Sequence, residues 1–223
     1  MQFKIYLQKN DQNAAINQVQ AMTTCLDFSP EFLSLSAHEA IACHVLPVAV
    51  AALSNLLNFY ATGKSMPTTE AVVLRTLVTI LSQEPRNELE ILKFVKRAYN
   101  RASELGPDCF FGKGEVGRRE WNWFAASSWN FGIKSGKDAN FQLCADFLRL
   151  ASEFYGLLVE GQVEENNIMV CKSLILTVSA LIASENKNKV ALTDNEVKQT
   201  TELLDRAGKV LNKYFVPNSN KTK

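Results

Sequence analysis

The sequence contains few of the residues on which enzymatic chemistry depends. It has only two histidines, His38 and His44. At about 100° of rotation per residue, these side chains would lie about 120° apart on a helix, so they cannot share a metal ion as an i, i+4 pair can. No serine or cysteine stands in a nucleophile-elbow motif. We therefore expect no enzyme, no catalytic residue, no metal site, no cofactor and no small-molecule substrate, although a triad assembled from distant segments stays open.

The cysteines do not form a recognisable framework either. They number five, they are far apart, and none forms a C-x-x-C pair: Cys25, Cys43, Cys109, Cys144 and Cys171. An odd number at such spacing argues against a disulfide scaffold or a zinc ribbon. We interpret them as small apolar residues in a reducing compartment.

Neither a large charge excess nor a clear membrane segment is present. The formal net charge is +1, so the excess expected of a dedicated nucleic-acid binder is missing. The first nine residues include Lys4 and Lys9, which argues against a secretory leader. Polar residues such as Asn55 and Lys172 interrupt the two most apolar windows, residues 40–57 and 168–183. We expect no export and no membrane span.

What the sequence does have is helical periodicity almost throughout. Apolar residues recur every three or four positions, and no segment alternates with the period of a strand. About five helix pairs begin near residues 1, 30, 67, 118 and 166, a spacing typical of helix-turn-helix repeats. This predicts an all-α, tetratricopeptide-like helical-hairpin solenoid of about ten helices. A globular helical bundle is the alternative.

We expect a single helical-repeat domain over residues 1–215, either complete or a fragment of a longer solenoid. Residues 216–223 are expected to form a disordered tail. No separate catalytic or cofactor domain is expected.

Several helix starts carry capping residues. Asp11 can cap the second helix, and Ser29 followed by Pro30 opens the third. Thr193 and Glu196 have the spacing of a capping box at the start of the last helix.

Three breaks between helices are expected, and one row of apolar residues is expected to be buried. Residues 106–117 should be the longest irregular stretch, residues 135–137 should separate two helices, and polar residues 184–189 should link the last pair. On the final helix one row of residues is expected to be buried: Val197, Leu204, Ala207, Leu211 and Tyr214.

The segment from Gly112 to Gly117 reads G-x-G-x-x-G and precedes a helix. A dinucleotide fingerprint requires a strand before this motif and a parallel sheet around it, and neither is expected here. We interpret the segment as an inter-helix loop whose glycines allow positive φ. An anion-binding loop, aided by Lys113 and the arginines that follow, is the alternative.

Basic residues gather over residues 93–119. Lys96 and Arg101 contribute to this basic surface, and five further residues are the candidates for binding a partner: Lys113, Arg118, Arg119, Lys93 and Arg97. The surface suits DNA or a phosphorylated protein.

Aromatic residues concentrate on one helix. Trp121, Trp123 and Trp129 are expected to fill the interior, and anchoring an interface with a partner is the alternative. The string Trp129-Asn130-Phe131-Gly132 is similar to the opening of a tetratricopeptide repeat, in which a large ring packs against a small residue. The residues expected to pack successive repeats are Trp129, Asn130, Gly132, Trp121 and Trp123.

Longer strings carry a family resemblance. They are residues 17–25 (NQVQAMTTC), 26–43 (LDFSPEFLSLSAHEAIAC), 76–83 (TLVTILSQ), 102–119 (ASELGPDCFFGKGEVGRR) and 129–132 (WNFG). Over roughly Asn13 to Leu211 the chain resembles the plant-type, meiosis-specific tetratricopeptide-repeat proteins of the zipper/sporulation (Zip-four / Spo-twenty-two) family, in the later part of their repeat array.

The resemblance implies a scaffold in the nucleus, on meiotic chromosomes. Such a scaffold promotes crossover formation by homologous recombination and the synapsis of homologous chromosomes. Its implied partners are other pro-crossover proteins and proteins of the chromosome axis, with no direct binding of DNA expected. Members of the family are several times longer than this chain, and the family has no catalytic residues to carry over.

Overall fold

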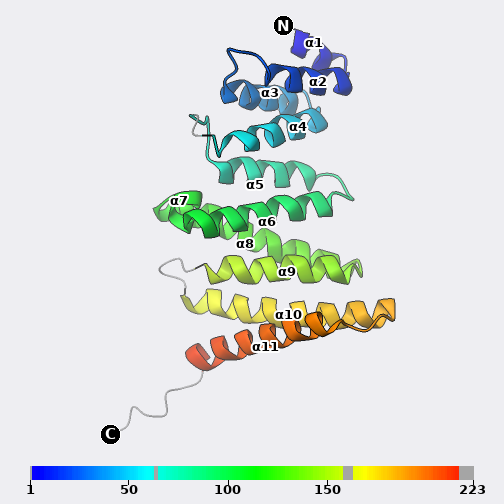
Figure 1. Ribbon diagram of the computed structural model, residues 1–223, viewed down its shortest axis with the longest axis vertical. Helices are drawn as coiled ribbons and strands as arrows, with labels where there is room; N and C mark the ends of the chain where they lie inside the picture. Colours follow the sequence, from blue (N-terminus) through cyan, green and yellow to red (C-terminus); the bar gives the residue numbers. More distant parts are fainter. Residues whose placement is uncertain (1, 63–64, 158–162, 216–223) are drawn as a thin grey trace. The chain divides into compact units, whose positions relative to one another are not determined.

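The computed structural model describes residues 2–62, 65–157 and 163–215, and every regular element within them is a helix (Figure 1). This confirms the all-α class and the expected number of about ten helices. The chain divides into two compact units, Met1–Phe94 and Val95–Lys223. Continuity of one domain over residues 1–215 stays a prediction, and the expected tail at residues 216–223 lies outside the described residues.

The first unit is built around α4. Its helices are α1 (Gln2–Gln8), α2 (Gln12–Met22), α3 (Pro30–Ala42), α4 (Leu46–Leu56), the 3₁₀ turn η1 (Leu57–Phe59), α5 (Glu70–Leu81) and the beginning of α6 (Glu88–Leu105). α4 packs against α2, α3 and α5, and its Val48, Ala52 and Leu56 are fully buried. A helix with three neighbours must be apolar on most of its surface, which the sequence of α4 provides.

Capping residues set the boundaries of several helices as expected. The Asp11 carboxylate accepts the Ala14 N–H at 3.1 Å, and the Ser29 hydroxyl accepts the Glu31 N–H at 3.4 Å. In the second unit, the Thr193 N–H and hydroxyl both donate to the Glu196 carboxylate, and the Thr193 hydroxyl accepts the Glu196 N–H. These bonds, the backbone donor first, lower the pKa of Glu196. The three predicted caps are confirmed.

The second unit stacks helices in sequence order. It contains the rest of α6, then α7 (Pro107–Phe111), α8 (Gly114–Lys137), α9 (Phe141–Gly156), α10 (Val163–Asn188) and α11 (Asp194–Phe215). α9 packs between α8 and α10, and α11 packs on α10 (Figure 1). This contact between each helix and its neighbours in the sequence is the packing of a helical-hairpin solenoid.

Close contact between α8 and α9 depends on one glycine. A Cβ at Gly132 would lie 2.7 Å from Leu148 Cγ and 3.3 Å from the Leu148 backbone nitrogen, so the two helices leave no room for a side chain there. Further along the same interface, the Trp121 indole N–H donates to the Phe154 carbonyl at 2.6 Å. Trp121 and Phe154 are both buried.

The three expected breaks are placed wrongly. α7 and the first turn of α8 occupy most of residues 106–117, α8 continues through residues 135–137, and α10 continues to Asn188. Gly136 lies inside α8, where α8 packs closely on α9. A Cβ at this position would lie only 3.1 Å from the Cys144 sulfur, so the close contact favours glycine here. Packing against α9 therefore overrides the low helix propensity of this glycine.

The expected buried stripe of α11 is also mostly wrong. Ala207 is buried, but Val197, Leu204 and Leu211 are each 40–50% exposed. The side chain of Tyr214 lies outside the described residues. The row that packs on α10 consists instead of Leu203, Ala207 and Val210.

Residues Glu164–Asn188 of α10 are long and apolar enough to cross a membrane, by length and composition. The expectation that Lys172 excludes a span is therefore wrong by these two criteria. However, 44% of the most apolar window is buried in the structure, and α10 packs against both α9 and α11. Buried core helices meet the same criteria, so composition does not distinguish the two cases.

Replacing Gly132 by alanine should destabilise the second unit. The added methyl group meets Leu148 and its backbone, and the cost of overpacking exceeds the gain in helix propensity, for a net loss of about 1–2 kcal/mol. Urea denaturation would measure it. The matched control is Asn130→Ala, since Asn130 is exposed on the same helix and should change the free energy of unfolding by less than about 0.5 kcal/mol. Equal stability of the two variants would contradict the close contact.

Candidate partner-binding surfaces

A groove crosses the first unit where α3 and α5 rise on either side of α4. It encloses about 300 Å³. Its walls and floor come from three helices and the segment before α5: Ser34, Ala37, His38 and Ile41 of α3, Leu53 and Leu56 of α4, Pro67 and Thr68, and Val72, Val73 and Thr76 of α5. We call this the α3–α5 groove.

Residue spacing explains why the groove is open. On α3, Ser34, Ala37 and Ile41 recur at intervals of three and four, so they share one face of the helix. Two of these three side chains are small, which leaves space between α3 and α5. The floor is firm because Leu53 and Leu56 of α4 are buried beneath that space.

One rim of the groove is held by a tyrosine. The Tyr60 hydroxyl donates to the Thr68 carbonyl at 2.7 Å. Burial, followed by the negative charge of Glu70, raises the pKa of Tyr60 to about 12. The hydroxyl therefore stays protonated and keeps this bond at all physiological pH values. At the start of α5, the Thr69 hydroxyl accepts the Val72 N–H at 3.4 Å and fixes the next turn.

The groove is mainly apolar, and its polar lining residues are Ser34, His38, Thr68 and Thr76. The Thr76 hydroxyl is already used, because it donates to the Val72 carbonyl at 2.8 Å. His38 lines the groove and is exposed. Such a surface can enclose an apolar side chain of a partner.

A second hollow in this unit lies between the first three helices. It encloses about 460 Å³ and includes Gln2, Gln18 and Ser36. Its lining is more exposed than that of the α3–α5 groove, in which buried leucines form the floor. The α3–α5 groove is therefore the better candidate.

The basic residues of α6 are largely engaged in ion pairs. Lys93 lies 3.5 Å from Glu90, Lys96 lies 3.9 Å from Asp146, and Arg101 lies 2.8 Å from Glu104. Arg97 also has an interaction partner. Exposed pairs of this kind contribute little stability. They do reduce the positive potential that the sequence suggested for this helix.

The predicted partner-binding residues do not form one site. Lys93 belongs to the first unit, whereas Arg97, Lys113, Arg118 and Arg119 belong to the second. The last three are exposed at the start of α8. In the same turn stands the carboxylate of Glu115, which opposes the binding of an anion.

Steric reasons explain the glycine motif without a ligand. Gly112 and Gly114 have φ of 98° and 67°, in the region that favours glycine. A Cβ at Gly117 would overlap the Gly112 carbonyl oxygen. The helix α7 precedes the motif, where a nucleotide fold would have a strand. Positive φ between two helices is confirmed, although the last four residues of the motif already belong to α8.

The residues expected to pack repeats lie in different environments. Trp121 and Gly132 are buried, and Asn130 is exposed. Trp129 is partly buried against a cluster that includes Leu148. Trp123 is also partly buried, with its ring edge-on to Phe124 at 5.0 Å.

Sequence reasoning did not find the α3–α5 groove. Its only signal is the pair of small residues Ser34 and Ala37 on an otherwise apolar helix. Small residues also occur where two helices pack closely, so the spacing alone does not separate a groove from a contact.

Within residues 2–62, 65–157 and 163–215, no group of three His, Cys, Asp or Glu side chains is placed to hold a metal ion. The thiols of the described cysteines are free, and burial raises the pKa of both Cys144 and Cys171. No family model matches the chain, and no solved structure matches it significantly.

The Tyr60 bond predicts a specific pH dependence. The folded state raises the pKa of this phenol from 10.0 to about 12, so the protonated form is favoured by folding. Its contribution to stability is complete below about pH 10 and is lost as the pH rises towards 12. The Tyr60→Phe variant lacks this contribution, so its difference in unfolding free energy from the unmodified chain should shrink between about pH 9 and 12. A constant difference, measured by urea denaturation, would show that Tyr60 titrates normally.

Proposed function

We propose that this chain is a non-enzymatic scaffold that binds other proteins, and that the α3–α5 groove receives an apolar side chain of the partner. One observation carries the proposal. The groove is preformed, mainly apolar and floored by buried leucines, and it lies in a unit made of packed helical hairpins. Such hairpins commonly present their grooves to partner helices or extended segments.

The size of the groove suits one anchor residue. A volume of about 300 Å³ is at the lower end for binding pockets, enough for a single leucine or aromatic side chain. Burying such a side chain contributes about 1.5–3 kcal/mol. Val72, on the wall, is 37% exposed, and Leu35 on α3 is 60% exposed, so the partner can cover further apolar surface.

The process served is proposed from the sequence resemblance. We infer that the scaffold acts in the nucleus, on meiotic chromosomes, where it promotes crossover formation and synapsis. Its partners are then other pro-crossover proteins and proteins of the chromosome axis. What supports this is the resemblance of several long strings to the zipper/sporulation family, together with a helical-hairpin fold of the expected kind.

Direct DNA binding through residues 93–119 is the alternative. The ion pairs of Lys93, Lys96 and Arg101 count against it, because cations that already have carboxylate partners add little to binding of a phosphate backbone.

Direct DNA binding can be tested separately on the purified chain. The purified chain should bind duplex DNA weakly even at low salt, because its net charge is +1 and Lys93, Lys96 and Arg101 of α6 are paired with carboxylates. Fluorescence anisotropy with labelled duplex would measure this across a salt series. Tight binding whose logarithm falls steeply with the logarithm of salt concentration would favour the DNA-binding function instead.

Changing Val72 to aspartate should remove partners from the scaffold. The carboxylate would face the apolar groove, where burying an unpaired charge is costly, so recovery of partners should fall at least about tenfold. The measurement is affinity purification from meiotic tissue with the chain as bait, followed by quantitative mass spectrometry. Pro-crossover and axis proteins are the expected prey.

The matched control is Leu26→Asp, because Leu26 is fully exposed in the same unit and does not line the groove. It should retain the prey of the unmodified chain. Equal loss of prey in both variants, or no loss with Val72→Asp, would contradict the role of the groove. Recovery of unrelated proteins alone would contradict the meiotic assignment and leave the groove assignment standing.

A further inference from the structure

The last helix exposes a seam that has the spacing of a coiled coil. Val197, Leu204 and Leu211 are 50%, 47% and 40% exposed. Thr201 and Gly208 fall between them, so the row advances by four, three, four and three residues. This is the repeat by which one helix packs along another. We call the row the α11 seam.

The α11 seam faces away from α9 and flanks the row that packs on α10. Leu203, Ala207 and Val210 face α10, and Arg206 reaches back to the Glu153 carboxylate of α9. At about 100° per residue, Leu204 lies about 160° around the helix from Arg206. The seam therefore points away from α9.

The neighbouring helix exposes apolar residues on the same side. In α10, Ala180 packs in the cluster with Cys144 of α9. Ile182 lies about 160° around α10 from Ala180, and Ile175 shares its row. These two isoleucines are 45% and 46% exposed. They extend the apolar face beside the α11 seam.

No contact within the chain explains why residue 208 is a glycine. It stands inside a 22-residue helix, where glycine is less favourable than alanine by about 0.5–1 kcal/mol. A Cβ at this position would meet nothing within 4 Å. By contrast, a Cβ at Gly132 would overlap Leu148. A close contact with something outside this chain would explain why position 208 lacks a side chain.

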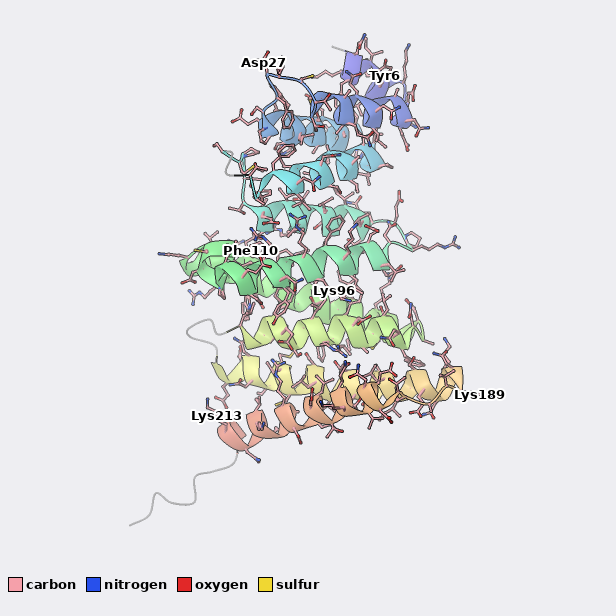
Figure 2. All side chains as sticks on the ribbon, in the orientation of Figure 1. Tyr6, Asp27, Lys96, Phe110, Lys189 and Lys213 are labelled. Carbon is pink, nitrogen blue, oxygen red and sulfur yellow. The ribbon has the colours of Figure 1, made fainter. Side chains whose placement is uncertain are left out.

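The charges along α11 are divided between its halves. Residues 194–205 carry four carboxylates and one lysine, whereas residues 206–215 carry three cations and no carboxylate. Figure 2 labels Lys213 in the last turn and Lys189 shortly before the first, and so marks the two ends of the helix. Arg206 is engaged with Glu153 on the far side of the helix, so it adds nothing at the seam. The remaining division of charge favours an antiparallel partner helix, because the acidic half then avoids the acidic half of the other copy.

We propose that a second copy of this chain packs antiparallel on the α11 seam and forms a symmetric dimer. An antiparallel pair places the large residues of one seam over the small residues of the other. A parallel pair would place Gly208 against Gly208 and leave a void. One antiparallel register seats Val197 over Gly208 and Leu204 over Thr201 of the other copy, and it brings Lys198 beside the other copy's Asp205. Because the interface is two-fold symmetric, each of these contacts occurs twice.

The size of the face is compatible with a dimer. A helix of 22 residues is about 33 Å long. With α10 included, the face is roughly 20 Å wide and covers roughly 650 Å², which approaches the ~800 Å² per partner of a standard stable interface. Ile175 and Ile182 are therefore part of the expected contact.

Analytical ultracentrifugation of the purified full chain over a concentration series tests the proposal. The expected result is a reversible dimer of the 24.9 kDa chain. Leu204→Asp should raise the dissociation constant at least about thirtyfold, because it removes a central anchor. Val116→Asp should leave it unchanged, since Val116 is 69% exposed on α8 and lies outside the seam.

Two further sets of variants guard against simple misfolding. Gly208→Leu fills open space in a single chain, so it should keep its circular dichroism spectrum and melting temperature and yet be monomeric. Lys198→Glu and Asp205→Lys should each weaken the dimer about fivefold, and the double variant should restore it, because the pair is merely reversed.

The outcomes separate cleanly. Monomer for the unmodified chain at the highest soluble concentration overturns the proposal. A dimer that survives both Leu204→Asp and Gly208→Leu does the same, since it must use another surface. If the double charge variant restores the dissociation constant of the unmodified chain, both the antiparallel direction and the register are supported. If it does not, that register is overturned.

Discussion

Burial of α9 on nearly all sides is the constraint on which the second unit depends. Its Phe147, Leu148, Ala151 and Phe154 are almost completely inaccessible to solvent, because α8 covers one side and α10 the other. Neither neighbour could bury its own apolar face without this helix between them. α4 plays the same part in the first unit, where it contacts α2, α3 and α5. A chain of hairpins is held together in this way by its sandwiched helices more than by its loops.

Helices without such complete coverage are the ones that can meet other molecules. α3 and α5 stand on either side of α4 and leave the α3–α5 groove between them. α11 packs on α10, and the seam beside this contact is open. Both proposed functions of the molecule use apolar surface that the stacking of helices leaves uncovered. Charge has a secondary role, since most of the basic residues on α6 pair with nearby carboxylates.

The sequence predicted those features that are encoded locally. Asp11, Ser29 and Thr193 act as caps because a single side chain and the next two or three residues suffice to form the bond. It did not predict that α8 continues past Gly136, since that depends on the fit to Cys144 of another helix. The exposed seam of α11 was missed for the same reason: periodicity identifies an apolar row without showing whether a neighbour covers it. The α3–α5 groove likewise depends on the distance between two helices, to which the spacing of Ser34 and Ala37 gives no guide.

The junction between α7 and α8 has a consequence for how sequences of this type should be compared. The Gly112 carbonyl occupies the space that any side chain at position 117 would need, so only glycine fits there. Natural selection would then preserve G-x-G-x-x-G in descendants of this chain purely through backbone geometry. If those glycines are conserved across species, the cause would be steric exclusion of other side chains. A survey that takes the pattern as evidence of nucleotide binding would then misassign such proteins.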